Sequence, residues 1–191
     1  MSYKTYITEA LVCGASTRNT SDKSFLLFTR EAGMLYASAK SVREERSKQR
    51  FSLQEFSIIR VTLVHGKAGW RVIGTEPLTN VYAEQRTREA RAFVRNVIRL
   101  LRRLIQGEVP HERLYDEVIP LLRLEHRGNE VGLEEVLTLR ILNMLGYIAP
   151  TPETLPLFTS TDIDRMVREL DPKAAPLRAA IIEKALHESH L

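Results

Sequence analysis

The sequence predicts an α+β protein, with a small five-stranded β-barrel at the N-terminus followed by an all-helical domain. Over residues 3–76, five short segments rich in β-branched, aromatic and aliphatic residues are separated by turn-forming residues. After Pro77 the apolar residues recur three and four positions apart, which is the period of a helix. We therefore expect a barrel domain over residues 1–80 and a helical domain over residues 81–191.

The predicted strands alternate between apolar and polar residues, most clearly where Ile59, Val61 and Leu63 are separated by polar positions. Residues 66–69, with a glycine at each end, predict a hairpin between the last two strands. Five strands within roughly seventy residues suit a closed barrel, because closure removes exposed strand edges. The predicted strands are residues 5–12, 24–30, 34–40, 56–65 and 70–75.

Glycines and prolines divide the helical part. One apolar stripe runs from residue 86 to residue 105, and Gly107 and Pro110 end it. Residues 149–161 form a proline-punctuated connector. Further helices are expected at about 112–125 with a kink or break at Pro120, 133–145 with Gly146 as C-cap, 161–170 with Thr161 and Asp164 in capping-box spacing, and 175–188.

The net charge of +4 is unevenly distributed along the chain. Residues 1–80 have 12 basic and 7 acidic side chains, and residues 81–103 have 7 arginines against 2 glutamates. Residues 104–191 have 9 basic and 15 acidic side chains, so the sum there is negative. Such asymmetry is typical of a polyanion-binding region joined to a region with another role.

Several functional classes lack their signatures in this sequence. Cys13 is the one cysteine, so neither an intramolecular disulfide nor a cysteine zinc site is expected, and a core thiol in a cytoplasmic protein is the simplest interpretation. The sequence contains no phosphate-binding glycine loop, no His-Glu-x-x-His motif and no apolar run of about 18 residues. We therefore expect no enzyme activity, cofactor, metal or membrane span.

The strongest binding signal is a basic loop between the third and fourth predicted strands. Lysine and arginine side chains on such a loop suit sequence-independent contacts with DNA phosphates, because each displaces a condensed counterion. Trp70 and Phe51 are candidate stacking surfaces for unpaired bases, with core packing as the alternative for both. We assign DNA binding to Lys40, Arg43, Arg46, Lys48 and Arg50, extended by Lys67 and Arg71 of the next hairpin.

A second signal is a row of arginines on the first predicted helix. Their spacing of three and four residues places them on one face, opposite the apolar stripe, along about 21 Å. Like charges in such a row repel one another unless an anion balances them. That anion is either an acidic peptide or DNA, or the protein's own acidic helices with Asp116, Glu117, Glu134 and Glu135. The row comprises Arg88, Arg91, Arg95, Arg99 and Arg102.

An ordered set of motifs over about residues 5–150 resembles the bacterial RecO family of DNA repair and recombination mediators. The set includes Phe-Thr-Arg-Glu-Ala-Gly at 28–33, Leu-Gln-Glu-Phe-Ser at 53–57, Gly-Lys-Ala-Gly-Trp at 66–70 and Leu-Gly-Tyr at 145–147. The resemblance implies an N-terminal oligonucleotide/oligosaccharide-binding (OB) barrel and a helical domain in a nucleoid-associated protein. It also implies binding of single- and double-stranded DNA, strand annealing, and work with RecR to load RecA onto strands coated by single-strand binding protein.

The sequence departs from the family pattern after residue 147. Many members have a four-cysteine zinc module there, whereas residues 149–161 of this chain contain prolines and no cysteine. We therefore expect a short member without the zinc module. The alternative is a protein-interaction adaptor of the repair machinery that does not bind DNA, and a nuclease is a third reading, for which no metal-ligand cluster is apparent.

Overall fold

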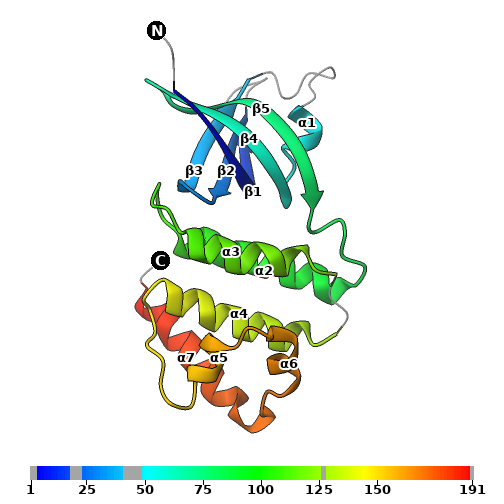
Figure 1. Ribbon diagram of the computed structural model, residues 1–191, viewed down its shortest axis with the longest axis vertical. Coiled ribbons are helices and arrows are strands. Elements are labelled where there is room, and N and C mark those ends of the chain that lie inside the picture. Colours follow the sequence, from blue (N-terminus) through cyan, green and yellow to red (C-terminus); the bar gives the residue numbers. More distant parts are fainter. Residues whose placement is uncertain (1–3, 18–22, 41–48, 126–127, 190–191) are drawn as a thin grey trace. The chain divides into compact units, whose positions relative to one another are not determined.

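The computed structural model describes residues 4–17, 23–40, 49–125 and 128–189 of the 191-residue chain. The chain forms two compact units, one of residues 1–85 and 105–124 and the other of residues 86–104 and 125–191 (Figure 1). Residues 105–124, which include helix α3, are thus part of the first unit. The domain limits of 1–80 and 81–191 remain a prediction.

The first unit contains a closed five-stranded barrel with strand order β1-β2-β3-β5-β4. Neighbouring strands are antiparallel except β3 and β5, which pair in parallel and close the barrel. The strands are β1 Thr5–Thr17, β2 Lys23–Thr29, β3 Gly33–Ala39, β4 Ser57–Gly66 and β5 Gly69–Asn80. A short helix, α1 (Gln49–Ser52), precedes β4. The predicted N-terminal barrel followed by helices is confirmed.

Alternation along the strands explains how the barrel interior is filled. Leu35, Ala37 and Ala39 of β3 lie in the core cluster, so the intervening side chains of this strand face outward. The interior also contains Phe25, Leu27, Ile59, Val61 and Leu63. Cys13, on the other phase of β1, is buried at 3% exposure, and its thiol lies 3.6 Å from the carbonyl oxygen of Leu11.

Helix α3 (Glu112–Arg123) packs on the barrel through both apolar and backbone contacts. The rings of Phe28 and Tyr115 lie 5.3 Å apart, and the Met34 amide donates to the Gly107 carbonyl at 3.1 Å. Gly33 has a φ of +67°, and a Cβ at this position would lie 2.1 Å from the Val109 carbonyl oxygen. Only glycine permits this approach of the segment that leads into α3.

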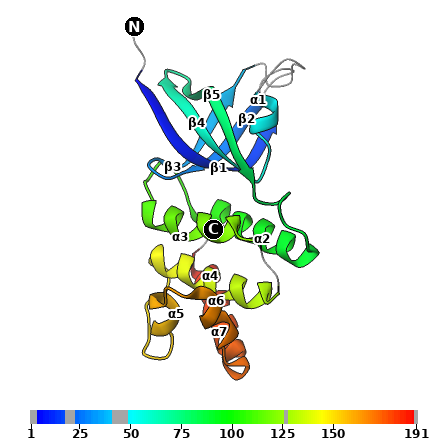
Figure 2. The same ribbon diagram turned by 45° about the vertical axis from the view of Figure 1, so that its right-hand side comes forward.

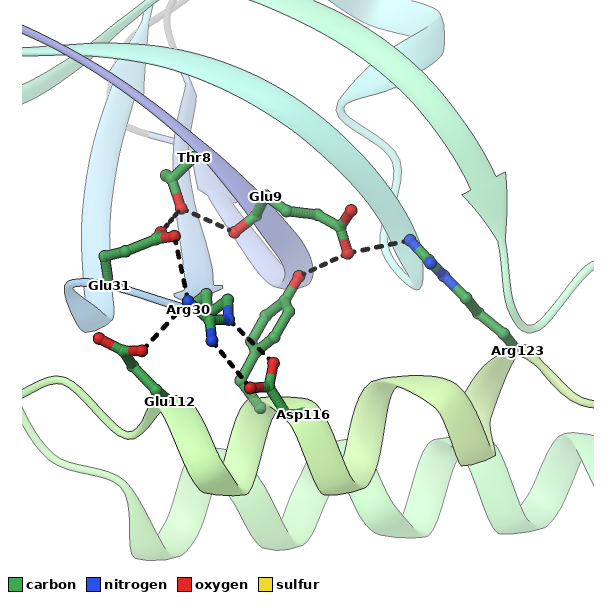
Figure 3. A network of polar contacts seen from close by, with 8 residues as sticks. Thr8, Glu9, Arg30, Glu31, Glu112, Asp116 and Arg123 are labelled. Carbon is green, nitrogen blue, oxygen red and sulfur yellow. Dashed lines mark hydrogen bonds and ion pairs between the residues drawn. The ribbon is translucent and has the colours of Figure 1, made fainter.

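A polar network also joins α3 to strands β1 and β2 (Figure 3). The Arg30 guanidinium donates two hydrogen bonds of 2.9 Å to Asp116 and lies 3.1 Å from the Glu112 carboxylate. On the other side, Glu9 accepts from Arg123 at 2.9 Å and from the Tyr115 hydroxyl at 3.2 Å. Burial and the charge of Glu9 raise the pKa of Tyr115, which therefore remains a hydrogen-bond donor.

The second unit is built around α4 (Glu130–Met144), which contacts α2 (Arg88–Leu104) and the three later α-helices (Figure 2). These later helices are α5 (Leu155–Thr159), α6 (Ile163–Arg168) and α7 (Ala175–Glu188), with the short 3-10 turn η1 (Pro172–Ala174) before α7. Helix α7 has the limits expected from sequence. Two expectations need correction: α5 lies within the predicted connector, and Asp162 rather than Thr161 caps α6 by accepting from the Arg165 amide at 2.9 Å.

Candidate nucleic-acid interface

A basic cavity of about 350 Å³ lies at the β4–β5 hairpin of the barrel. Lys40 comes directly after β3, Lys67 lies in the hairpin, and Arg71 lies near the start of β5. The remaining lining is small or apolar and comprises Ser38, Val64, Gly66, Ala68 and Gly69. Three of the seven predicted DNA-binding residues therefore line one cavity.

The closure of the barrel explains why these residues meet. Strands β3 and β5 pair in parallel through Ala37 with Trp70 and Ser38 with Arg71. The Ser38 hydroxyl donates to the Trp70 carbonyl at 3.2 Å, which adds a side-chain bond to this short ladder. The end of β3 is thereby placed beside the beginning of β5, although the two segments are far apart in sequence.

Among the described residues, the three cations of the cavity have no acidic partner. Lys40, Lys67 and Arg71 are exposed, and none of them has a carboxylate at ion-pair distance among the residues that the structure describes. Elsewhere on the same barrel, Arg60 pairs with Glu76 at 2.8 Å. A cavity whose cations lack internal partners attracts anions such as phosphate groups.

The other predicted DNA-binding residues are not placed in this cavity. Arg43, Arg46 and Lys48 fall within residues 41–48, which lie outside the described part of the chain. Arg50 belongs to α1, but the structure gives no description of its side chain. Their assignment to DNA binding remains a prediction.

The two aromatic candidates differ in their surroundings. Trp70 packs against the barrel core, with its ring 5.2 Å from that of Tyr6 and 4.8 Å from that of His65. Both contacts are edge-on, so core packing describes Trp70 better than a free stacking surface. Phe51, on α1, is 70% exposed.

Sequence reasoning missed Tyr36, an aromatic residue of β3 that is 64% exposed. The signal for its exposure was the alternation of the strand, because Tyr36 lies between Leu35 and Ala37, which both face the core. Tyr36 therefore faces outward on the same side of β3 as Ser38 and Lys40, the two residues of this strand end that line the cavity.

The arginine row of α2 is exposed along its whole length. Arg88, Arg91, Arg95, Arg99 and Arg102 are all exposed, whereas the opposite face of α2 is buried through residues such as Phe93, Val97 and Leu101. Within the described ranges, no ion pair is formed by Arg88, Arg95, Arg99 or Arg102.

Three of the carboxylates considered as internal partners of this row bind elsewhere. Asp116 accepts from Arg30, Glu134 accepts from Asn96 at 3.1 Å, and Glu135 pairs with Arg178 at 2.9 Å. The arrangement therefore does not support neutralisation of the row by these three residues.

In the part of the chain that the structure describes, no three His, Cys, Asp or Glu side chains gather as a metal site would require. Over the same residues, no helix is sufficiently long and apolar to span a bilayer.

Comparison with known proteins adds an independent observation. No protein-family model matches the chain. The DNA repair protein RecO of Pelotomaculum thermopropionicum is 27% identical to it over 144 residues. This similarity supports membership of the RecO family. It confirms the RecO resemblance of the sequence motifs, although the aligned region covers 75% of this chain and only 56% of the relative.

In this RecO-like chain, buried arginines stabilise the segment that follows α4. Arg140 of α4 donates to the carbonyls of Leu157, at 2.7 Å, and Ser160. Arg178 of α7 donates to the Asp171 carbonyl at 3.1 Å and pairs with Glu135. These contacts join α4 and α7 to the chain between them.

Proposed function

We propose that the protein binds DNA at the basic cavity of its barrel and acts as a recombination mediator in DNA repair. The observation behind this proposal is the convergence of Lys40, Lys67 and Arg71 on one cavity, where no carboxylate of the described residues lies at ion-pair distance. Two facts support it: OB-type barrels bind oligonucleotides across strands 2 and 3 and the loop between strands 4 and 5, and the relative named above is a DNA repair protein.

The proposed mechanism is annealing of complementary strands without sequence recognition. Lysine and arginine contacts with phosphates release counterions and screen the repulsion between two strands, while the bases remain free to pair. The contacting set comprises Lys40, Lys67 and Arg71 of the cavity together with Arg43, Arg46, Lys48 and Arg50 of the adjoining segment.

We assign the protein partners to the same pathway. In this proposal the protein assists RecR in loading RecA onto strands coated by single-strand binding protein. The acidic tail of single-strand binding protein then binds the arginine row of α2, because that row is exposed and none of Arg88, Arg95, Arg99 and Arg102 has an ion pair among the described residues.

The salt dependence of DNA binding tests the role of the cavity. The triple variant Lys40→Gln, Lys67→Gln, Arg71→Gln is compared with the wild-type chain for a fluorescent 30-nucleotide single strand at several salt concentrations. The slope of log affinity against log salt is negative, and each lost phosphate contact makes it shallower by about 0.7. We therefore expect the slope of the triple variant to be shallower by about 2. The variant also anneals complementary strands more slowly.

The matched control is Arg60→Gln, which removes an exposed barrel cation that already pairs with Glu76. We expect its salt slope to equal that of the wild-type chain. A triple variant with an unchanged slope contradicts the assignment of the cavity. A wild-type chain that binds no DNA even at low salt favours the adaptor without DNA binding.

A further inference from the structure

We infer that Tyr36 is a stacking surface for an unpaired base and gives the barrel a preference for single-stranded DNA. This inference rests on the proposed function, since it adds a base contact to the phosphate contacts of the basic cavity. Three observations support it: the exposure of Tyr36, the cations of the basic cavity near it, and the open surface at Gly69.

The position of Tyr36 follows from the alternation of β3. Tyr36, Ser38 and Lys40 face outward, and the latter two line the basic cavity. Two residues along a strand span about 6.6 Å. The Tyr36 side chain is therefore the outward-facing neighbour of Ser38, which lines the cavity. A nucleotide whose phosphate contacts Lys40 or Arg71 can therefore place its base over this ring.

The surroundings of Tyr36 leave its ring available. The side chain is 64% exposed, and no aromatic ring of the described residues packs against it. Trp70 differs in this respect, because the rings of Tyr6 and His65 contact it. An exposed tyrosine combines an apolar ring with a polar hydroxyl, a combination that is enriched at binding interfaces.

Tyr36 pairs with Leu26 on the β2 side, and toward β5 a glycine precedes the ladder. Ala37 pairs with Trp70 in the β3–β5 ladder, and the residues immediately before them are Tyr36 and Gly69. A Cβ added at Gly69 would meet no atom within 4 Å, so this part of the surface is open. An open glycine beside an exposed ring leaves space for a flat base.

A single strand can contact the cations through its phosphates and Tyr36 through a base at the same time, whereas a duplex cannot. The bases of a single strand are free to stack on a side chain, and those of a duplex are already stacked on one another. Stacking does not depend on base identity because every base has an aromatic face. The barrel therefore distinguishes unpaired from paired DNA without reading sequence.

Binding to an abasic strand isolates the stacking contribution. The full chain and its variants Tyr36→Ala, Tyr36→Phe and Phe51→Ala are titrated with a fluorescent thymidine 30-mer and with an abasic strand of equal length and charge. We expect Tyr36→Ala to lower affinity for the thymidine strand about fivefold or more and to leave binding to the abasic strand unchanged. Tyr36→Phe retains the ring and the wild-type affinity.

Phe51→Ala tests the competing candidate for base stacking, since Phe51 is another highly exposed aromatic residue of the barrel unit. Two results overturn the inference while phosphate binding stands: equal affinity of the wild-type chain for both strands, or a loss caused by Phe51→Ala and not by Tyr36→Ala. Failure of the wild-type chain to bind either strand contradicts the proposed function itself. Unchanged abasic binding by Tyr36→Ala also shows that this variant is folded.

Discussion

The barrel unit contains two groups of cations with opposite surroundings. Arg30 and Arg123 point toward carboxylates of Asp116 and Glu9, and these contacts join α3 to strands β1 and β2 (Figure 3). Lys40, Lys67 and Arg71 line the cavity at the β4–β5 hairpin, where no described carboxylate lies at ion-pair distance. Both groups consist of basic residues, but only the first has carboxylate partners among the described residues.

Carboxylate partners, rather than charge, distinguish the cations that join α3 to the barrel from the cations that line the cavity. A cation that already donates to a carboxylate contributes to folding, and its removal leaves an acid without its partner. A cation without a partner gives little to stability and remains free to bind an external anion. Substitutions in the two groups should therefore affect different measurements, namely unfolding in the first group and DNA binding in the second.

The largest expected effect comes from two glycines that belong to these regions. Gly33 lies at the packed side, where a Cβ would meet the Val109 carbonyl, whereas Gly69 lies in the open cavity. Both have positive φ angles, so alanine costs about 1–2 kcal/mol of conformational energy at either position. The clash adds to this cost at Gly33 alone, and we expect Gly33→Ala to lower the free energy of unfolding by about 3 kcal/mol or more.

Urea unfolding of both variants measures the comparison. Gly69→Ala is the matched control because it has the backbone strain without the steric conflict. Equal losses in the two variants would contradict the close packing of the segment around Val109 against the barrel. A larger loss for Gly33→Ala agrees with it.

Much of the barrel could be predicted from sequence because its strands alternate. Ile59, Val61 and Leu63 face the core as their spacing indicates. The strands β1 and β5 extend beyond their predicted ends, since polar residues and Pro77 do not resemble a strand locally. Pairing with β4 extends β5, and Pro77 lies opposite Ile59 next to an irregularity in the ladder, where proline is tolerated.

The helical part shows the same limit of local patterns. Helix α7 has the limits that its apolar spacing and its proline predict. Helix α5 was not predicted, because Leu155–Thr159 begins with a proline-interrupted sequence of weak helical character. Arg140 of the preceding helix α4 contacts it by donating to the Leu157 carbonyl. Such tertiary contacts have no signature in the local sequence.

The charge pattern predicted three cations of the candidate cavity, whereas the aromatic candidates chosen from sequence did not include Tyr36. Lys40, Lys67 and Arg71 were predicted because cations near a hairpin suggest phosphate contacts, and the cavity brings them together. Tyr36 was missed because an aromatic residue in a strand is usually a core residue. Its neighbours Leu35 and Ala37 decide the matter, since only one face of β3 can point into the barrel.

An intermediate effect concerns α2, whose arginine row extends the comparison to the second unit. If these three arginines have no internal partner, Arg95→Gln, Arg99→Gln, Arg102→Gln removes only repulsion, and the free energy of unfolding rises by about 0.5 kcal/mol. The same variant should bind a fluorescent peptide copying the acidic tail of single-strand binding protein about three- to tenfold more weakly.

The control for this variant is Arg165→Gln, which removes an arginine that pairs with Glu169 on α6. We expect it to leave peptide binding unchanged. A loss of stability in the triple variant would show that internal acidic residues neutralise the row. Undiminished peptide affinity would refute the assignment of the row to an acidic partner.

The smallest expected effect is the pH dependence of the Arg30–Asp116 pair. The hydrogen bonds from Arg30 lower the pKa of Asp116 below its ordinary value. Because the folded pKa lies below the unfolded value of about 3.9, the pair stabilises the fold above about pH 4 and loses this contribution as the pH falls through the folded pKa. Asp116→Asn should therefore unfold more easily than the wild-type chain at pH 7, with a difference that shrinks toward pH 3.

Urea unfolding between pH 7 and pH 3 measures this difference. Glu76→Gln is the control, since Glu76 pairs with a single exposed arginine, Arg60, away from α3. A pH-independent difference for Asp116→Asn would mean that the substitution acts through packing and not through charge. We expect wild-type DNA affinity in Asp116→Asn at pH 7, because a paired cation such as Arg30 should contribute to the fold and not to the phosphate contacts proposed for the cavity.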